Sequence, residues 1–352
     1  MSYDPFARGP HPVGVRSATV DSAGRSVPVE IWYPTRDSNV GKDLDPATQD
    51  TYVLGPGLPA APQAALRDGL PSVEATSGTA PTIVFSHGFG GHRRQTTHLT
   101  THLASHGYVV AAPDHMGNTA TEVMGWMLGV GAPADMAAYT RETATNRVAD
   151  ATRTLDGLLS GEFGVTGATA SCGITGHSFG GWTTLATTAA DPRIRAALPL
   201  APAGGDGGVL AGPDDPRIAM RDMLELDWDR PVDVLTLVAD GDTVLPYPMM
   251  ADLLARATGI DRLVVLANAD HYHFCDNVEA VHDLMSMTMG EGAKPSSELV
   301  PGDHAYAMTT ALGLAHFDAS LRGSPPAAAF LAQDLRAVLA ERGVDITVVT
   351  RN

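Results

Sequence analysis

Continuous apolar runs of strand length recur along the chain and alternate with runs that suit a helix. The strand-like runs are 81–88, 107–114, 170–176, 195–202, 232–242 and 262–270, and the helix-like runs are 93–105, 141–160, 179–190 and 248–258. A strand that is apolar on both faces belongs in a sheet that is covered on both sides. Alternating strands and helices imply right-handed crossovers between parallel neighbours. The pattern therefore predicts an α/β fold with a mostly parallel, eight-stranded sheet and helices on both faces.

The N-terminal part of the chain has a different pattern. Residues 15–20 and 27–33 alternate apolar and polar side chains and flank the turn-forming stretch DSAGRS. Alternation around a short polar turn predicts a β-hairpin, and we expect it to add antiparallel strands at one edge of the sheet.

Four stretches interrupt the alternation of strands and helices, and none of them has the character of a linker between domains. We therefore expect a single domain over residues 1–352, with insertions near 36–80, 116–140, 202–230 and 276–306. The first insertion is rich in proline, glycine and alanine and is predicted to be a surface excursion. Segments after the carboxyl ends of parallel strands border the ligand crevice, so 116–140 and 276–306 are candidate pocket walls.

Charge and composition narrow the class of protein. With 23 basic and 40 acidic residues the formal net charge is −17, which argues against a nucleic-acid partner and against docking on anionic lipid. No apolar run is long enough to span a membrane. The N-terminus lacks the basic and apolar regions of a signal peptide, so a cytoplasmic protein is expected, although a removed signal would leave no trace. The two cysteines, Cys172 and Cys275, are predicted to be buried free thiols or to form a single bridge.

The stretch GHSFGG, residues 176–181, lies between an apolar strand-like run and a helix-like run. A serine that is exposed on a sharp strand-to-helix turn is the nucleophile of many hydrolases, and glycines must flank it because side chains there would clash. The amides at the start of the following helix would face the same site. Ser178 is therefore the candidate nucleophile, and the alternative is a serine that only caps the helix.

A serine nucleophile needs a base and an acid that orients the base, in the chain order serine, acid, histidine. The stretch ADGDTVLP follows the strand-like run 232–239 and offers Asp240 and Asp242. We favour Asp242, because it lies further past the strand, and a turn role suits Asp240. The stretch NADHYHFCD offers His271 and His273, and we favour His271 as the base because it comes first after its strand.

Acyl transfer also needs amides that stabilise the developing oxyanion. The stretch FSHGFGG, residues 85–91, follows an early strand, so the amides of Phe89 and Phe179 are the candidates, with His87 in a structural role. Trp126, Met127 and His273 are candidate substrate-binding residues. A histidine pair spaced like His271 and His273 can also bind metal, but no third ligand has a convincing spacing, so neither a metal nor another cofactor is predicted.

Four stretches, VPVEIWYPT, VFSHGFGGHR, GHSFGGWT and DHYHF, resemble those of α/β-hydrolases of the platelet-activating-factor-acetylhydrolase-like and dienelactone-hydrolase-like group. The resemblance covers about residues 10–320. It implies an α/β-hydrolase fold. In that group the catalytic histidine lies in an H-x-x-F motif, which His271 and Phe274 match, so the resemblance supports His271 over His273. True dienelactone hydrolases use a cysteine where this chain has Ser178. The stretches GDTVLP and HFC are loosely similar to those of cutinase-like polyester hydrolases.

These observations predict a serine hydrolase that cleaves carboxylic esters through an acyl-enzyme. The expected substrates are small-molecule esters with short-to-medium acyl groups, or acetylated lipids. Acyl transfer by the same triad and polyester hydrolysis remain alternatives, and a catalytically silent binding protein is a third. The sequence indicates neither the oligomeric state nor the alcohol portion of the substrate.

Overall fold

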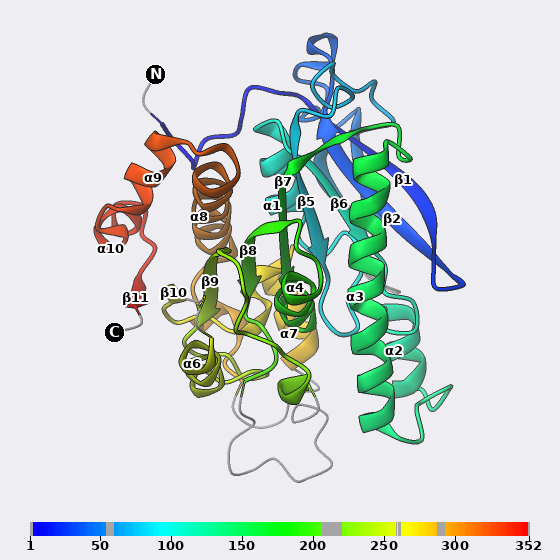
Figure 1. Ribbon diagram of the computed structural model, residues 1–352. Helices are drawn as coiled ribbons and strands as arrows, with labels where there is room; N and C mark the ends of the chain where they lie inside the picture. The colour runs from blue at the N-terminus through cyan, green and yellow to red at the C-terminus, as the bar shows by residue number, and fades with distance from the viewer. Residues whose placement is uncertain are drawn as a thin grey trace.

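The computed structural model describes residues 3–350 except 54–59, 206–219, 258, 260–261 and 287–292, and of Met127 it describes only the backbone. Within these residues one sheet of eleven strands forms the centre of the protein, with helices packed against it (Figure 1). Its strand order is β11-β10-β9-β8-β7-β5-β6-β2-β1-β4-β3. The pairs from β6 through β5, β7, β8 and β9 to β10 are all parallel. The predicted α/β architecture with a mostly parallel centre is confirmed.

The strands have these bounds: β1 Val13–Ser22, β2 Arg25–Pro34, β3 Gln49–Val53, β4 Ala60–Arg67, β5 Ala80–Ser86, β6 Val109–Pro113, β7 Gly167–His177, β8 Ile194–Leu200, β9 Asp233–Ala239, β10 Arg262–Leu266 and β11 Ile346–Thr350. The helices are α1 Thr97–Ser105, α2 Ala120–Met127, α3 Met136–Ser160, α4 Phe179–Ala190, α6 Tyr247–Arg256, α7 Val278–Ser286, α8 Gly302–Arg322, α9 Pro325–Leu331 and α10 Leu335–Ala340. The described residues also contain the short 3₁₀ helices η1 Asp37–Asn39, η2 His271–Phe274 and η3 Ser296–Glu298.

The two faces of the sheet are covered by different helices, and the side chains of β5 show how. Ile83 and Phe85 pack in a core cluster with side chains of α1 and α8, whereas Val84 packs on the opposite face with side chains of α3, α4 and α6. Successive strand residues point to opposite faces, so a strand that is buried on both sides must be apolar throughout. All seven residues of β5 are buried, which accounts for its continuous apolar sequence.

The predicted N-terminal hairpin is present as β1 and β2, which pair antiparallel along their whole length. The turn residues Ala23 and Gly24 have positive φ angles of 51° and 77°, as a tight hairpin turn requires. β2 joins the hairpin to the parallel centre by pairing antiparallel with β6.

The predicted number of eight strands is wrong, because the sheet has eleven in the described residues. Two of the additional strands, β3 and β4, come from the stretch 36–80 that the sequence predicts to be a surface excursion, and they extend the sheet beyond the hairpin. Proline and alanine have low strand propensity, but β4 pairs with β1 and its Gln63 accepts a hydrogen bond from the buried indole of Trp32 at 2.7 Å. At the other edge, β11 pairs antiparallel with β10.

Candidate active site

Ser178 lies at the turn between β7 and α4, where the predicted strand and helix meet. Its backbone has φ 60° and ψ −117°. Residues other than glycine rarely adopt this conformation, and such strained backbone occurs often at functional sites. Hydrogen bonds hold it there: its amide donates to Leu200 O at 2.9 Å, and its carbonyl accepts from the amides of Trp182 and Ala203. These bonds present the side chain at the carboxyl edge of the sheet.

The glycine after the turn is required by a close approach between α4 and β5. A Cβ atom on Gly180 would lie 1.8 Å from Ser86 O, and one on Gly176 would lie 2.4 Å from Gly180 O. Both distances are far below van der Waals contact. The glycines of the GHSFGG stretch therefore allow the turn at Ser178 to pack directly against the neighbouring strand.

Asp242 and His271 lie together at the carboxyl ends of β9 and β10. Nδ1 of His271 is 2.8 Å from Oδ2 of Asp242, and both side chains are buried. Oδ1 of Asp242 accepts hydrogen bonds from the amides of Val244 and Leu245 at 2.9 and 2.6 Å. The carboxylate therefore favours a proton on Nδ1 of His271, which leaves Nε2 as the basic nitrogen.

Asp270 supports this pair, and the sequence analysis did not single it out. Its carboxylate accepts hydrogen bonds from the amides of His271 at 2.6 Å and Thr243 at 2.9 Å. One buried side chain thus joins the loop that carries Asp242 to the loop that carries His271. The signal was present in the sequence, since an aspartate directly before a short helix is a common N-cap.

The competing candidates, Asp240 and His273, make contacts outside the pair of Asp242 and His271. Asp240 is exposed, and its carboxylate accepts a hydrogen bond from the amide of Ala269 at 3.3 Å, which is a turn role. His273 is buried beneath the loop, where Nδ1 accepts from the amide of Asp270 and Nε2 donates to Val300 O at 2.9 Å. It does not line the cavity described below, so its predicted contact with substrate has no support in this geometry.

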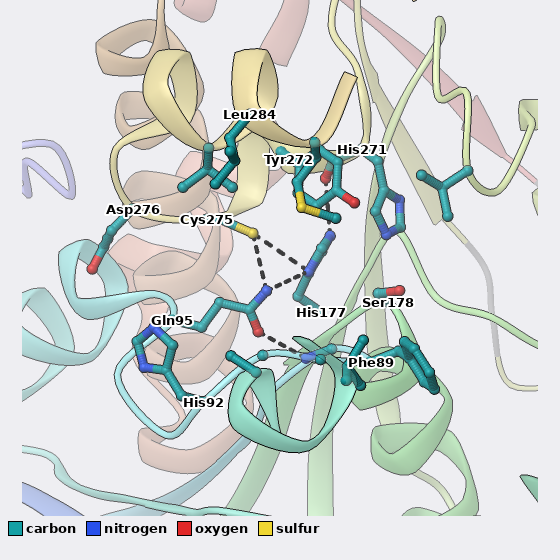
Figure 2. A pocket seen from close by; sticks show the side chains of 18 of the residues that line it. Phe89, His92, Gln95, His177, Ser178, His271, Tyr272, Cys275, Asp276 and Leu284 are labelled. Atoms are coloured by element: carbon teal, nitrogen blue, oxygen red, sulfur yellow. Dashed lines mark hydrogen bonds between the residues drawn. The ribbon is translucent and has the colours of Figure 1, made fainter. Parts of the chain in front are cut away.

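Ser178 and His271 face the same space, as Figure 2 shows. The structure records no hydrogen bond between their side chains. Such bonds are often long in a free enzyme and tighten when substrate binds. Ser178 is 9% exposed to solvent, whereas His271 is 2% exposed. The serine is therefore the more accessible of the two to an incoming ligand.

A cavity of about 290 Å³ begins at Ser178. Its walls come mainly from three segments: the loop after β5, helix α2 and the segment from η2 to α7. The lining residues are Gly88, Phe89, Gly90, Gly91, His92, Gln95, Ala120, Val123, Met124, His177, Ser178, Val244, His271, Tyr272, Cys275, Asp276, Val281, Leu284 and Met285. Both stretches that the sequence analysis proposed as pocket walls, 116–140 and 276–306, contribute to it.

The candidate oxyanion amides come from two segments, the loop after β5 and the start of α4. Phe179 is the first residue of α4, so its amide has no acceptor within the helix. The amide of Phe89 has no hydrogen-bond acceptor among the described residues, and Phe89 lines the cavity with a side chain that is 45% exposed. Both amides are therefore available to a ligand.

Trp126 does not line the cavity but lies behind Phe89. Its ring is 5.9 Å from the ring of Phe89 and 5.0 Å from that of Tyr139. It therefore supports the cavity wall from behind. The side chain of Met127 lies outside the described residues.

A hydrogen-bond network, drawn as dashed lines in Figure 2, connects three segments of the site through Gln95. Oε1 of Gln95 accepts from the amide of Gly88 at 2.7 Å, and its Nε2 lies 3.1 Å from both Nδ1 of His177 and Sγ of Cys275. Nε2 of His177 is in turn 2.9 Å from the carbonyl oxygen of His271. Sequence reasoning missed Gln95, because its partners are 7, 82 and 180 residues away.

Protonation fixes the direction of these bonds. Burial, together with the neighbouring His271, holds the pKa of His177 well below its ordinary value, so the ring is neutral at neutral pH. Because Nε2 donates to the carbonyl of His271, Nδ1 must be the nitrogen that accepts from Gln95. Burial also raises the pKa of the Cys275 thiol to about 12, so Cys275 is a weak partner and not a thiolate nucleophile.

Both cysteines are free and buried, so the alternative of a single bridge is wrong. In the part of the chain that the structure describes, no three histidine, cysteine, aspartate or glutamate side chains form a group suited to a metal ion. Among the same residues, no helix combines the length and apolar character needed to cross a membrane.

Comparison with known proteins agrees with the fold. The structure is similar to that of a ferulic acid esterase from Streptomyces cinnamoneus, with a TM-score of 0.62 and 23% sequence identity over 97% of this chain and 96% of the other. A model of the family described as platelet-activating factor acetylhydrolase, isoform II, matches residues 71–126. The fold is that of an α/β-hydrolase, and residues 71–126 are similar to the platelet-activating factor acetylhydrolase family.

The matched segment of this α/β-hydrolase contains β5, the loop with Phe89 and most of α2, and it ends before Ser178. The family model and the solved structure are both named for ester hydrolysis. A search of curated proteins gives no match to the chain.

Proposed function

We propose that this α/β-hydrolase cleaves carboxylic esters through an acyl-enzyme on Ser178. The observation that carries the proposal is the pair of His271 and Asp242, joined at 2.8 Å, at the cavity into which a serine with φ 60° projects. The nucleophile, the acid and the base follow one another along the chain in the order typical of the fold.

In the first half of the reaction, Nε2 of His271 accepts the proton of Ser178 as its oxygen attacks the ester carbonyl. Asp242 stabilises the imidazolium that forms. The amides of Phe89 and Phe179 bind the oxyanion, and each such donor contributes about 3 kcal/mol in comparable sites. His271 then protonates the leaving alcohol. In the second half, His271 activates a water molecule that hydrolyses the acyl-enzyme and frees Ser178.

The walls of the cavity support esters with apolar groups of short-to-medium length. Apolar side chains on α2 and α7 face each other across it, among them Val123, Met124, Val281 and Leu284. Asp276 is the acidic side chain of the lining set, and its carboxylate is occupied by hydrogen bonds from Thr97 and His98. A neutral ester is therefore the favoured ligand, and acetylated lipids are one class that fits.

The test is a rate profile on p-nitrophenyl esters from acetyl to palmitoyl. Each methylene that enters an apolar pocket gains about 0.8 kcal/mol, so kcat/KM is expected to rise roughly fourfold per methylene until the cavity is full and then to fall. Ser178→Ala is expected to abolish turnover and labelling by a fluorophosphonate. Ser77→Ala, which removes an exposed hydroxyl group on the loop before β5, is the matched control.

Near-normal activity of a folded Ser178→Ala protein would overturn the mechanism. Acyl transfer is distinguished by adding an alcohol acceptor, since a transferase forms the new ester in preference to the free acid. Polyester hydrolysis is distinguished by product release from an insoluble polyester film. If activity continues to rise up to palmitoyl esters, the binding site is an open, lipase-like cleft and not the cavity at Ser178.

A further inference from the structure

A fully buried arginine lies beneath the loop that carries Phe89. Arg147 projects from α3, and none of its side chain is exposed to solvent. Its Nη1 and Nη2 donate to the carbonyl oxygens of His87 and Gly88 at 2.6 and 3.0 Å, and its Nε donates to Oδ1 of Asn118 at 3.1 Å. The guanidinium therefore contacts the candidate oxyanion loop directly.

The charge of Arg147 has no carboxylate partner at ion-pair distance among the described residues. Asp150 is one turn further along α3, but its carboxylate pairs with Arg25 at 2.7 Å and with Nδ1 of His115 at 3.1 Å. Burial lowers the pKa of Arg147 to about 9, so the group remains cationic at neutral pH. A buried charge without an ion partner is costly, and neutral donors would satisfy two carbonyl groups at less cost.

The bond to Gly88 has a chemical consequence for Phe89. The carbonyl of Gly88 and the amide N–H of Phe89 belong to one peptide group. That carbonyl accepts from three donors: Nη2 of Arg147, Nδ1 of His87 at 2.7 Å and the amide of Gly91 at 3.1 Å. Hydrogen bonds to one end of an amide polarise it and strengthen the donor at the other end, most of all when the bonding group is charged.

The same guanidinium also lies against the second candidate donor residue. Cζ of Arg147 is 4.3 Å from the centre of the Phe179 ring, a cation–π distance. A single buried cation thus contacts the peptide group that contains the Phe89 amide, through the carbonyl of Gly88, and the ring of Phe179. A fixed positive charge in a site shielded from water acts most strongly on charge that develops during the reaction.

We propose that Arg147 is a positioning residue whose buried charge strengthens the oxyanion site by polarising the Gly88–Phe89 peptide group. The proposal rests on the ester hydrolase function proposed above. It predicts that the charge of Arg147 stabilises the tetrahedral intermediate and contributes little to binding of the ground-state ester. A clamp that only holds the loop would require the shape of the guanidinium and not its charge.

The experiment compares Arg147→Met, which removes the charge, with Arg147→Lys, which keeps it on a single donor group. Arg153→Met is the control, because Arg153 lies on the same helix in an exposed pair with Glu162. The readouts are kcat and KM on the best p-nitrophenyl ester, affinity for an alkylboronic acid that forms a tetrahedral adduct with serine, and circular dichroism. Fluorophosphonate labelling of Ser178 in the wild type tests the proposed function separately.

For Arg147→Met we expect kcat to fall 30- to 100-fold with KM changed less than threefold, and boronate affinity to fall in parallel with kcat. Arg147→Lys should retain more than a tenth of wild-type kcat, and Arg153→Met should match the wild type. A folded Arg147→Met protein with kcat within threefold of the wild type would overturn the proposal. A lysine variant that folds and keeps less than a tenth of kcat would also overturn it, even if the methionine variant does not fold.

Discussion

Nε2 of Gln95 lies 3.1 Å from Nδ1 of His177, the residue that directly precedes the candidate nucleophile. Through this bond the loop after β5 is coupled to the loop of His271, because Gln95 also accepts from the amide of Gly88 and His177 donates to the carbonyl of His271. The spacing between Phe89, Ser178 and His271 therefore depends in part on this uncharged side chain.

Two substitutions of Gln95 separate its bond to the amide of Gly88 from its bond to His177. Gln95→Glu keeps an acceptor for the amide of Gly88 but, when ionised, has no proton to donate to His177, whereas Gln95→Leu loses both bonds. Displacement of a catalytic group by about 1 Å can cost about a hundredfold in rate. We expect kcat for ester hydrolysis to fall about tenfold in the glutamate variant and further in the leucine variant, with KM changed less than threefold.

Steady-state kinetics on a p-nitrophenyl ester measures this prediction. Cys275→Ala is the control, since it removes the weaker partner of Gln95 and leaves the bond to His177, and it should stay within threefold of the wild type. Equal kcat values for the wild type and the glutamate variant would show that donation to His177 does not position the base.

Asp276 anchors the segment after η2 to the start of α1. Its carboxylate accepts hydrogen bonds from the amide of Thr97 at 2.6 Å and the amide of His98 at 3.1 Å, which are the first residues of that helix. Burial raises the pKa of Asp276, but bonds from His98, Thr97 and Tyr52 outweigh this effect and hold the pKa below its ordinary value. We expect Asp276→Asn to lower the free energy of unfolding by about 3 kcal/mol at pH 7.

The pH dependence of this loss follows from the direction of the shift. A lowered pKa in the folded state stabilises the protein above the unfolded pKa, and the contribution disappears as pH falls through the folded value. Urea unfolding at pH 7 should therefore separate Asp276→Asn from the wild type more widely than unfolding near pH 3. Asp222→Asn, at a side chain that is 67% exposed, is the control. A difference that stays constant with pH would contradict the assignment.

Gly180 and Gly125 provide a matched pair of helical glycines. A Cβ on Gly180 would lie 1.8 Å from Ser86 O, whereas one on Gly125 of α2 would meet its nearest neighbour, Val130 O, at 3.4 Å. Helix propensity alone favours alanine at both positions by up to about 1 kcal/mol. We expect Gly125→Ala to be neutral or stabilising and Gly180→Ala to destabilise by more than about 3 kcal/mol, since backbone must move.

Thermal and urea unfolding measure both glycine variants. If Gly180→Ala unfolds at the same urea concentration as the wild type, the turn at Ser178 is not held against β5 as tightly as the distance indicates.

Local patterns along the chain predicted the parallel centre of the sheet and the strand-to-helix turn at Ser178. Continuous apolar strands, such as the one at 80–86, imply burial on both faces whatever their neighbours are. The glycines around Ser178 imply a crowded turn for a steric reason that is equally local. Asp242 and His271 were favoured by their distance past a strand, and the structure joins these two side chains rather than Asp240 and His273.

Tertiary structure decided what depends on partners distant in the chain. β4 is a strand because it pairs with β1 and because its Gln63 accepts a hydrogen bond from the indole of Trp32. Its own sequence is unsuited to a strand. The roles proposed for Gln95 and Arg147 depend on hydrogen bonds to residues that are distant in the sequence, such as those across 82 and 59 residues. Periodicity reports which face of an element is buried, but the residue that meets a given polar atom is decided only when the elements pack together.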